Sequence, residues 1–222
     1  MNELQNDMQQ VGGVWLPAHE KHMVEWMDTT NEVVDGRLTY QHGKLLEAMK
    51  WVKAWDLAVD IGAHVGTWSL QLAPRFKHLE AFEPESLHAA CFRRNLDGLG
   101  NWSLHNAALW DTPGHCDMLV EHGSSGNTKL VVGTHTPMHC LDHYNLPACD
   151  FIKVDCNGSE LPALAGGIET IKRFHPCISV EQKHARVSTA GQPQDGAIAF
   201  LHTLGAQIRH EHGGVYVMSW SN

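Results

Sequence analysis

The stretch Asp60-Ile61-Gly62-Ala63-His64-Val65-Gly66 constrains this chain more than any other segment. It follows the apolar run Leu57–Val59 and precedes a helical pattern that begins near Trp68. A strand that ends in an acid and a glycine-rich turn, and then leads into a helix, is typical of a cofactor site. Glycine permits positive φ and a close approach of the backbone to a ligand, and the first turn of the helix adds unpaired N–H groups. The residues expected at this site are Asp60, Gly62, Ala63, His64, Gly66 and Trp68.

A second acid, Glu83, follows the apolar segment Leu79–Phe82 and precedes Pro84. It lies about 20 positions after Asp60, the offset at which the next parallel strand presents an acid to a nucleotide ribose. A carboxylate can accept hydrogen bonds from both ribose hydroxyls. We therefore expect Glu83 and Pro84 to bind a ribose, with a role at a helix N-terminus as the simpler alternative for Glu83.

The spacing of the glycines indicates which cofactor this is. A dinucleotide site needs G-x-G-x-x-G to seat a pyrophosphate on a helix N-terminus, whereas this chain has Gly62-x-x-x-Gly66 with Asp60 in front. S-adenosylmethionine has no phosphate and carries a sulfonium, an ammonium and a carboxylate. An acid at Asp60 suits the cationic amino-acid part and would repel a pyrophosphate, so the pattern favours S-adenosylmethionine. A turn or capping acid is the alternative for Asp60.

Size and composition exclude several classes of protein. The chain has 222 residues, 43% of them hydrophobic and 18% charged, as expected for one globular domain. Its net charge of −9 argues against a protein that clamps nucleic acid through many phosphates. No apolar run reaches the ~18 residues of a membrane span, and the polar start lacks a signal peptide, so we expect a cytoplasmic protein without membrane contact. The six cysteines form no C-x-x-C pair and predict neither disulfides nor a zinc site.

The order of the elements predicts an α/β fold with a doubly wound, mostly parallel sheet. Residues 1–13 are expected to form a flexible tail, residues 14–56 a helical anchoring segment and residues 57–222 the main domain. The anchoring segment contains an amphipathic helix from Tyr40 to Trp55. The expected strands are Leu57–Ile61, His78–Phe82, Trp102–Ala107, Cys116–Val120, Asp150–Asp155 and Cys177–Val180. The expected helices are Trp68–Pro74, Ser86–Leu96, Glu160–Arg173 and Gln194–Leu204. The segments Ala206–Arg209 and Val215–Met218, on either side of His212-Gly213-Gly214, predict a C-terminal antiparallel hairpin.

Six motifs follow one another in the order of a known family. They are Asp60–Gly66, Phe82-Glu83-Pro84, Asn106-Ala107-Ala108-Leu109, Leu141-Asp142-x-Tyr144, Phe151–Glu160 and Val180-Glu181. In this series the chain resembles the FkbM family of S-adenosylmethionine-dependent methyltransferases over roughly residues 51–185, with an extension upstream through Tyr40-Gln41.

The resemblance implies a Rossmann-like class I methyltransferase domain that methylates a hydroxyl of a sugar or small metabolite. It also implies that Tyr40 and Gln41 contact the cofactor and that Asn106, Ala107 and Ala108 lie along the adenine. Asn106 could equally cap a turn. One position departs from the family pattern K-I-D-x-E-G, because Asn157 replaces the glutamate. If that glutamate activates the acceptor, the replacement bears on the rate or on the class of acceptor.

Three residues are candidates for catalysis. Asp155 ends a buried strand, where ligands bind in open α/β sheets, and it is also a candidate cofactor contact. Glu181 and His184 follow the next strand and could face the acceptor beside Asp155, or could equally form a surface pair. A hydroxyl acceptor needs a base to take its proton, and we expect one of the three to do so, alone or through a divalent cation. No motif supports such a cation, and at extended spacing His135, His139 and His143 lie too far apart to share one zinc.

Other functions remain as alternatives. A nicotinamide oxidoreductase would use the same cleft but lacks its glycine loop, and the replacement at Asn157 is compatible with a non-catalytic module that only binds the cofactor. The N-P-P-Y or D-P-P-Y motif of methyltransferases that act on nucleic-acid bases is absent. The expected partner is a small-molecule or carbohydrate acceptor, whose identity the residues do not indicate, and they do not indicate the oligomeric state.

Overall fold

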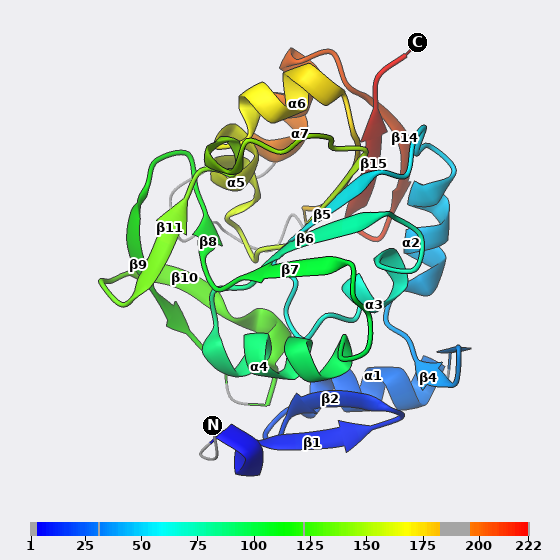
Figure 1. Cartoon of the computed structure of the whole chain (residues 1–222), viewed down its shortest axis with the longest axis vertical. Helices are drawn as coiled ribbons and strands as arrows, with labels where there is room; N and C mark the ends of the chain where they lie inside the picture. Colours follow the sequence, from blue (N-terminus) through cyan, green and yellow to red (C-terminus); the bar gives the residue numbers. More distant parts are fainter. Residues whose placement is uncertain (1–3, 31, 122, 183–195, 222) are drawn as a thin grey trace.

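The computed structural model describes residues 4–30, 32–121, 123–182 and 196–221. Its largest element is a seven-stranded sheet in the order β14-β15-β13-β12-β5-β6-β7 (Figure 1). The strands are β5 (Leu57–Ile61), β6 (His78–Phe82), β7 (Trp102–His105), β12 (Phe151–Val154), β13 (Cys177–Glu181), β14 (Gln207–His212) and β15 (Val215–Ser219). The pairs from β13 through β7 are parallel, and the β14–β15 hairpin is antiparallel. The predicted fold class and hairpin are confirmed.

The order of the strands indicates where a ligand would bind. The chain runs from β5 outward to β6 and β7, then crosses to β12 and β13 on the other side of β5. The connections that follow β5 and β12 therefore lead to opposite sides of the sheet, and the point between these two strands is the switch point where open α/β sheets bind ligands. Every residue of β5, β12 and β13 is buried, as expected for central parallel strands with both faces covered.

Helices cover the two faces of the sheet (Figure 1). The helices are α2 (His42–Met49), α3 (Ser69–Leu72), α4 (Ser86–Asn95), α5 (Glu160–Ala165), α6 (Ile168–Phe174) and α7 (Gly196–Thr203). The first three contribute Leu45, Leu72 and Phe92 to one core cluster, and the last three contribute Leu164, Ile171 and Leu201 to the other.

Three helices differ from the sequence prediction. The helix expected from Tyr40 to Trp55 spans only His42–Met49, because Gln41 has a left-handed φ of 57° and cannot continue a helix upstream. The helix expected from Trp68 to Pro74 is only Ser69–Leu72. The helix expected over 160–173 is broken at Gly166, where a Cβ would lie 2.0 Å from the Trp110 carbonyl oxygen, so a neighbouring strand connection occupies the space of a side chain.

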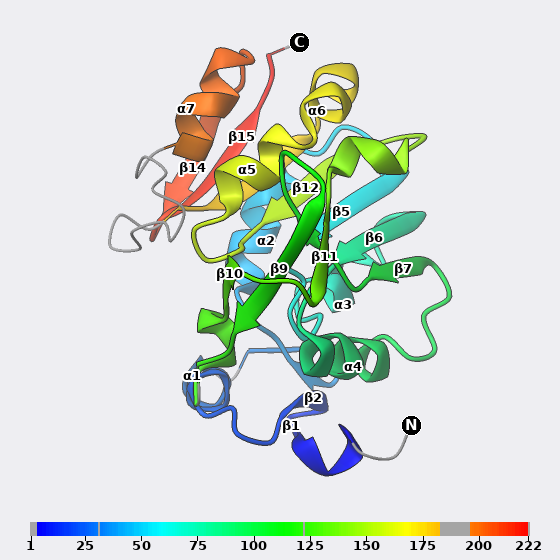
Figure 2. The ribbon, with the colours of Figure 1, turned by 90° about the vertical axis from the view of Figure 1, so that its left-hand side faces the viewer.

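A second, four-stranded sheet is inserted between β7 and β12, and the sequence predicted only one of its strands. Its strands are β8 (Ala108–Leu109), β9 (Gly114–Leu119), β10 (Lys129–Val132) and β11 (Thr136–His139), in the order β10-β9-β11-β8. Figure 2 shows β9, β10 and β11 side by side in front of the main sheet. The connection from β9 to β10 holds a short 3-10 helix, η2 (Ser125–Asn127).

Residues 4–13, within the expected flexible tail of 1–13, contain η1 (Leu4–Asp7) and the first strand of a β-hairpin, β1 (Met8–Val11). The anchoring segment that follows contains β2 (Val14–Pro17), α1 (His22–Thr30), β3 (Val33–Val34) and β4 (Arg37–Leu38). Strand β1 pairs with β2, and the Gln9 amide donates to the carbonyl oxygens of Pro17 and Glu20. Val14 and Leu16 are fully buried in a cluster with Cys91 of α4. These contacts, which depend on the folded domain, order a segment whose sequence is polar. Among the described helices, none is long and apolar enough to cross a membrane.

Candidate active site

A cavity of about 150 Å³ lies at the carboxyl ends of the central strands. Its walls from the main sheet are Ile61–His64 after β5, Phe82–Pro84 after β6, Ala107–Leu109 after β7, and Lys153, Asp155–Asn157 and Glu181 at β12 and β13. The remaining walls include Tyr40, Trp68, residues 22–23 of α1 and residues 124–128 around η2. Many separate parts of the chain thus enclose one site at the switch point of the sheet.

The glycine loop passes directly over the end of β12. Gly62 has a φ of 74°, and a Cβ there would lie 2.1 Å from the Asp155 carbonyl oxygen. The amides of Gly62 and Ala63 both donate to the Phe82 carbonyl oxygen at 3.0 Å. A Cβ at Gly66 would instead meet Phe92 and Leu96 at 2.8 Å. Gly62 is therefore required by the close approach at the cavity, and Gly66 by packing against α4.

Asp60 lies behind the cavity wall. Its side chain is fully buried, and Oδ2 accepts a hydrogen bond from Ser69 Oγ at 2.7 Å. Oδ1 lies 3.3 Å from Lys153 Nζ, an ion pair rather than a well-aligned hydrogen bond. Burial opposes the charge of Lys153, but the carboxylates of Asp60 and Asp155 outweigh it and raise the pKa of Lys153 above its usual value. Asp60 is not among the residues that line the cavity, whereas Lys153 is. Sequence reasoning missed Lys153, although a lysine within an apolar strand was a signal.

Glu83 lines the cavity and is oriented by the backbone around it. Its carboxylate accepts from His64 N at 2.7 Å and from Glu85 N at 2.9 Å, one bond to each oxygen. Each carboxylate oxygen can accept a further bond, so Glu83 keeps the capacity to bind hydroxyls. Asn106 supports the same corner, because its amide donates to the carbonyl oxygens of Glu83 at 2.8 Å and Pro84 at 3.0 Å. Asn106 therefore braces the backbone, while the neighbouring alanines, 107 and 108, line the cavity.

Two histidines lie next to Glu83. The rings of His64 and His88 meet edge to face with centroids 4.2 Å apart. His64 Nε2 lies 2.8 Å from Ser125 Oγ, which itself donates to the Glu20 carboxylate, so His64 donates to Ser125. Burial first, then the charges of His88 and Lys153, hold the pKa of His64 well below its usual value, and His64 is neutral.

Polar contacts hold the η2 loop against the cavity. Ser125 is fully buried, and its amide donates to Glu20 Oε2 at 2.6 Å. The Asn157 amide donates to the carbonyl oxygens of Gly126 at 2.8 Å and Thr128 at 2.9 Å. A glutamate cannot donate in this way. The residue that departs from the family pattern therefore ties the inserted sheet to the end of β12.

Acidic residues surround the opposite end of the cavity. Asp155 and Glu181 both line it, and Glu181 is buried. Burial first, then the charges of Asp155 and Glu181, raise the pKa of Tyr40 to about 12. The structure thus brings these two predicted acids into range of one tyrosine. Gln41 does not line the cavity, and its side-chain oxygen accepts from Trp68 Nε1 at 3.1 Å. His184, the third catalytic candidate, lies outside the described residues.

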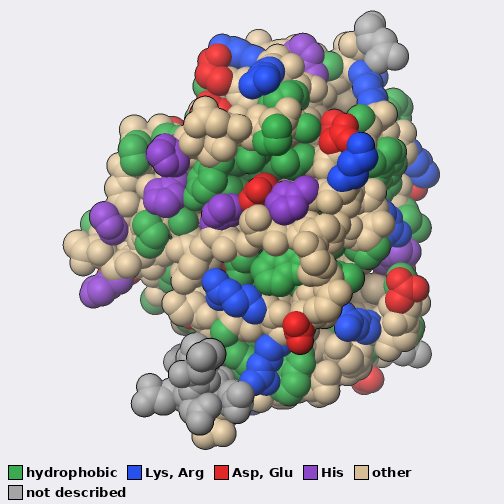
Figure 3. Space-filling model, viewed as in Figure 1, with side chains coloured by type: hydrophobic (Ala, Val, Ile, Leu, Met, Phe, Trp, Pro, Cys, Tyr) green, Lys and Arg blue, Asp and Glu red, His purple; other side chains and the backbone are tan. Residues whose placement is uncertain are grey.

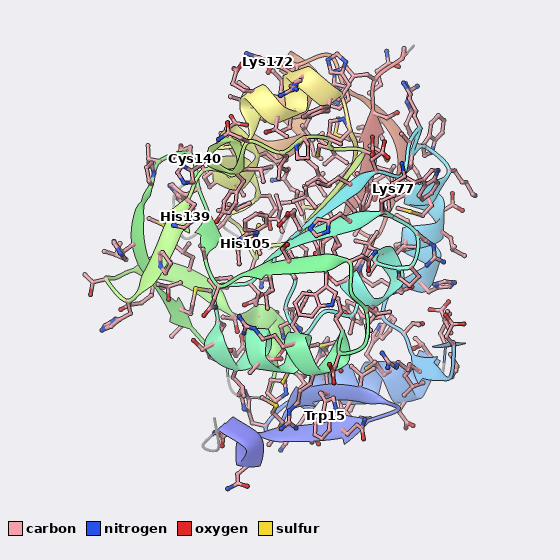
Figure 4. All side chains as sticks on the ribbon, in the orientation of Figure 1. Trp15, Lys77, His105, His139, Cys140 and Lys172 are labelled. Carbon is pink, nitrogen blue, oxygen red and sulfur yellow. The ribbon has the colours of Figure 1, made fainter. Side chains whose placement is uncertain are left out.

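Histidines also gather outside the cavity, on the face shown in Figure 3. Figure 4 labels His105 on β7 and His139 on β11, and both rings contact Tyr144. His139 Nδ1 lies 2.7 Å from the Tyr144 hydroxyl, whereas His135 contacts Asp117. Within the part of the chain that the structure describes, no three His, Cys, Asp or Glu side chains are placed to hold a metal ion.

The fold is that of a class I methyltransferase. The model of the methyltransferase FkbM domain matches residues 60–209, and the chain belongs to this family.

Solved structures show the same fold. A methyltransferase FkbM from Methylobacillus flagellatus KT matches with a TM-score of 0.52 and 16% identity, over 75% of this chain and 44% of its own length. The chain thus spans less than half of that protein. SMU.1697c from Streptococcus mutans, in complex with SAH, matches with a TM-score of 0.50 and 9% identity, over 81% of this chain and 94% of its own. No curated protein matches the chain significantly by sequence.

Proposed function

We propose that this methyltransferase uses S-adenosylmethionine to methylate a hydroxyl group of a sugar or small metabolite. One observation carries the cofactor assignment: the Glu83 carboxylate lines the cavity at the end of β6, held by two backbone N–H groups with acceptor capacity left over. That is the arrangement expected for an acid that binds the two hydroxyls of a ribose. The complex of a structural neighbour with SAH supports the same assignment.

Residues around Glu83 would hold the rest of the cofactor. Ala107 and Ala108 present small side chains where an adenine needs room, and the backbone of Gly62–His64 lies beside the path of the amino-acid tail. We propose that Asp60 serves the tail indirectly, because its charge acts through Lys153 and the glycine loop rather than across the cavity surface. When bound, the cofactor supplies a methyl group on a positively charged sulfur, which is a good leaving group.

The chain's own task is then to align the acceptor and to take its proton. We propose Asp155 as the base, with Glu181 beside it, since both are acids that line the cavity near Tyr40. With its pKa near 12, Tyr40 stays protonated at neutral pH and can donate a hydrogen bond to an acceptor or a carboxylate. His184 stays a third candidate base.

A cofactor-binding module without catalysis is the second candidate. Asn157 favours it, because its side-chain amide donates to the carbonyl oxygens of Gly126 and Thr128 at a position where the family pattern has an acid. The two candidates share the cofactor and differ only in turnover.

Calorimetry and an acceptor screen separate the possibilities. We expect S-adenosylmethionine and SAH to bind, NAD not to bind, and SAH to be released with a hydroxyl acceptor from a panel of sugars and small metabolites. Asp155→Asn should lose turnover and keep SAH binding, with the exposed Asp97→Asn as the matched control. Absence of SAH binding would contradict the proposal, and binding without turnover on any acceptor would favour the module.

A further inference from the structure

His88 lines the cavity, yet the proposed function gives it no task. It lies in the first turn of α4 and is only 1% exposed. Its Nδ1 is 3.4 Å from Glu83 Oε1 and 3.7 Å from Glu85 Oε2. Its Nε2 is buried without a hydrogen-bond partner. A buried polar atom of this kind is rare and costs free energy unless a ligand or a water completes it.

Titratable groups from three separate parts of the chain face the His88 ring. Glu83 and Glu85 come from the connection between β6 and α4, and Glu20 lies just ahead of α1. The ring of His64, from the glycine loop, is neutral and packs against it. Burial is the largest influence and opposes a charge on His88, but the hydrogen bond to Glu83 and the three carboxylates together exceed it and raise the pKa of His88.

A cationic imidazole has two N–H donors and no acceptor. In His88 the Nδ1 donor faces the same carboxylate oxygen that receives the Glu85 amide, so the imidazole helps fix which way Glu83 presents its free acceptor sites. The Nε2 donor is left over. A ribose bound by Glu83 brings hydroxyl oxygens, which can donate to the carboxylate and accept from an N–H at the same time.

We propose that His88 is a specificity-determining residue for the nucleoside of the cofactor: it orients Glu83 through Nδ1, and its Nε2–H serves an oxygen of the bound ribose. The proposal rests on the proposed function, because it takes the cofactor to be an adenosine derivative. It predicts that His88 makes the site favour a ribose with both hydroxyls over a deoxyribose. It also predicts that binding is tighter when His88 is protonated, so nucleoside affinity falls as pH rises through the titration of this residue.

The test measures dissociation constants of SAH and of its 2′-deoxy and 3′-deoxy analogues for the wild type and His88→Gln, between about pH 6 and 9, a range that spans the usual and the raised titration of histidine. At the low end of this range we expect His88→Gln to weaken SAH binding about tenfold, as for the loss of a hydrogen bond to a charged group. We also expect a smaller preference for SAH over the deoxy analogues, and a flatter pH profile. His115→Gln, an exposed histidine on β9, is the matched control and should behave as the wild type.

A second measurement needs no variant. NMR titration of the His88 imidazole in the wild type should show a pKa that rises when SAH is added, because a ligand that prefers the protonated ring must raise its pKa. Equal affinities, equal analogue preferences and equal pH profiles for the wild type and His88→Gln would overturn this inference and leave the proposed function intact. An unchanged His88 titration in a protein that binds SAH would overturn it as well. Failure of the wild type to bind SAH at any pH would overturn the proposed function, and this inference with it.

Discussion

Lys153 Nζ donates to the carbonyl oxygen of Gly62 at 2.6 Å. The same ammonium lies 3.3 Å from Asp60 Oδ1, and both side chains of this pair are almost completely buried. One cation therefore links β12 to the turn after β5 and balances the acid that ends that strand. The glycine loop is held in place from inside the sheet, before any ligand contributes.

Replacing Lys153 by methionine should destabilise the protein strongly. Asp60 would remain buried without its counter-ion, and breaking one partner of a buried pair costs about 3–5 kcal/mol. Urea unfolding measures this loss. The double variant Lys153→Met with Asp60→Asn should recover part of it, because no unpaired charge remains. Lys77→Met, which removes an exposed ion pair with Asp56, is the control and should leave the midpoint unchanged. Equal effects of the Lys153 and Lys77 variants would contradict the assignment.

Gly62→Ala should damage both stability and ligand binding. The new Cβ would lie 2.1 Å from the Asp155 carbonyl oxygen, and the φ of 74° is unfavourable for alanine. The left-handed backbone costs roughly 1–2 kcal/mol, and the clash adds about 1–3 kcal/mol of overpacking. Gly98→Ala has a φ of 86° with open space around it, so it measures the backbone cost alone. If the two variants unfold at the same urea concentration and bind SAH equally, the close approach at Asp155 has no role.

His64 should make the protein less stable in mild acid. Its pKa in the folded protein is held well below the ordinary 6.5, chiefly by burial. As pH falls below about 6.5 the unfolded chain therefore binds a proton that the folded protein does not, and stability is lost. His64→Asn, which suits the φ of 52°, removes this loss. We expect the stability of the wild type to fall relative to the variant by at most about 1.4 kcal/mol per pH unit below that point.

The measurement is the free energy of unfolding of both proteins between about pH 7.5 and 5.5, where an ordinary histidine titrates. His88 works in the opposite direction, because its raised pKa contributes stability below about pH 6.5 that is lost as pH rises through its folded value. The two rings are coupled, because the charge of His88 helps to lower the pKa of His64, so the difference between the wild type and His64→Asn contains this interaction as well. Parallel stability curves for the two proteins would contradict the buried neutral state of His64.

Asn157→Asp should loosen the η2 loop. The change removes both donors to the carbonyl oxygens of Gly126 and Thr128 and sets a negative oxygen against them. Each lost hydrogen bond is worth about 1 kcal/mol, and Asp tolerates the φ of 53°, so the backbone cost is small. Hydrogen exchange of residues 124–130 should become faster. Asn145→Asp is the matched control, since Asn145 is exposed and also left-handed, with a φ of 47°. Equal protection of the loop in both variants would show that the Asn157 hydrogen bonds do not hold it in place.

The strand ends that surround the site could be predicted from the sequence, because the patterns that mark them extend over only a few residues. Strand-forming segments end in Asp60, Glu83 and Asp155, and glycines follow the first of these. Parallel strands bring their carboxyl ends to one edge, so three strand ends located in the sequence already define the cavity floor. The C-terminal hairpin could also be predicted, because its turn glycines lie between two short segments that can pair as strands.

The helix ends and the second sheet were less accessible, since each depends on a distant neighbour. Gly166 lies at the break between α5 and α6, and the Trp110 carbonyl occupies the position of a side chain there, so only a glycine fits. The pairing of β11 with β8 and β9 joins short segments whose own patterns are weak. The sequence of one segment does not reveal which distant backbone will pair with it. Strands depend on such partners more than helices do, because their hydrogen bonds and side-chain contacts are made with neighbouring strands.

By itself the sequence determined the family, the parallel sheet and the acids at the strand ends, because periodicity and turn residues act over a few positions. Only the tertiary structure decided what those acids face. It set Asp60 against Lys153 behind the wall, placed His88 between three glutamates, and used Asn157 to hold a loop from the inserted sheet. Each of these three residues has at least one charged or hydrogen-bonding partner far away in the sequence. The folded structure brings such partners together in its buried interior, where polar groups need partners, and the local sequence pattern does not reveal them.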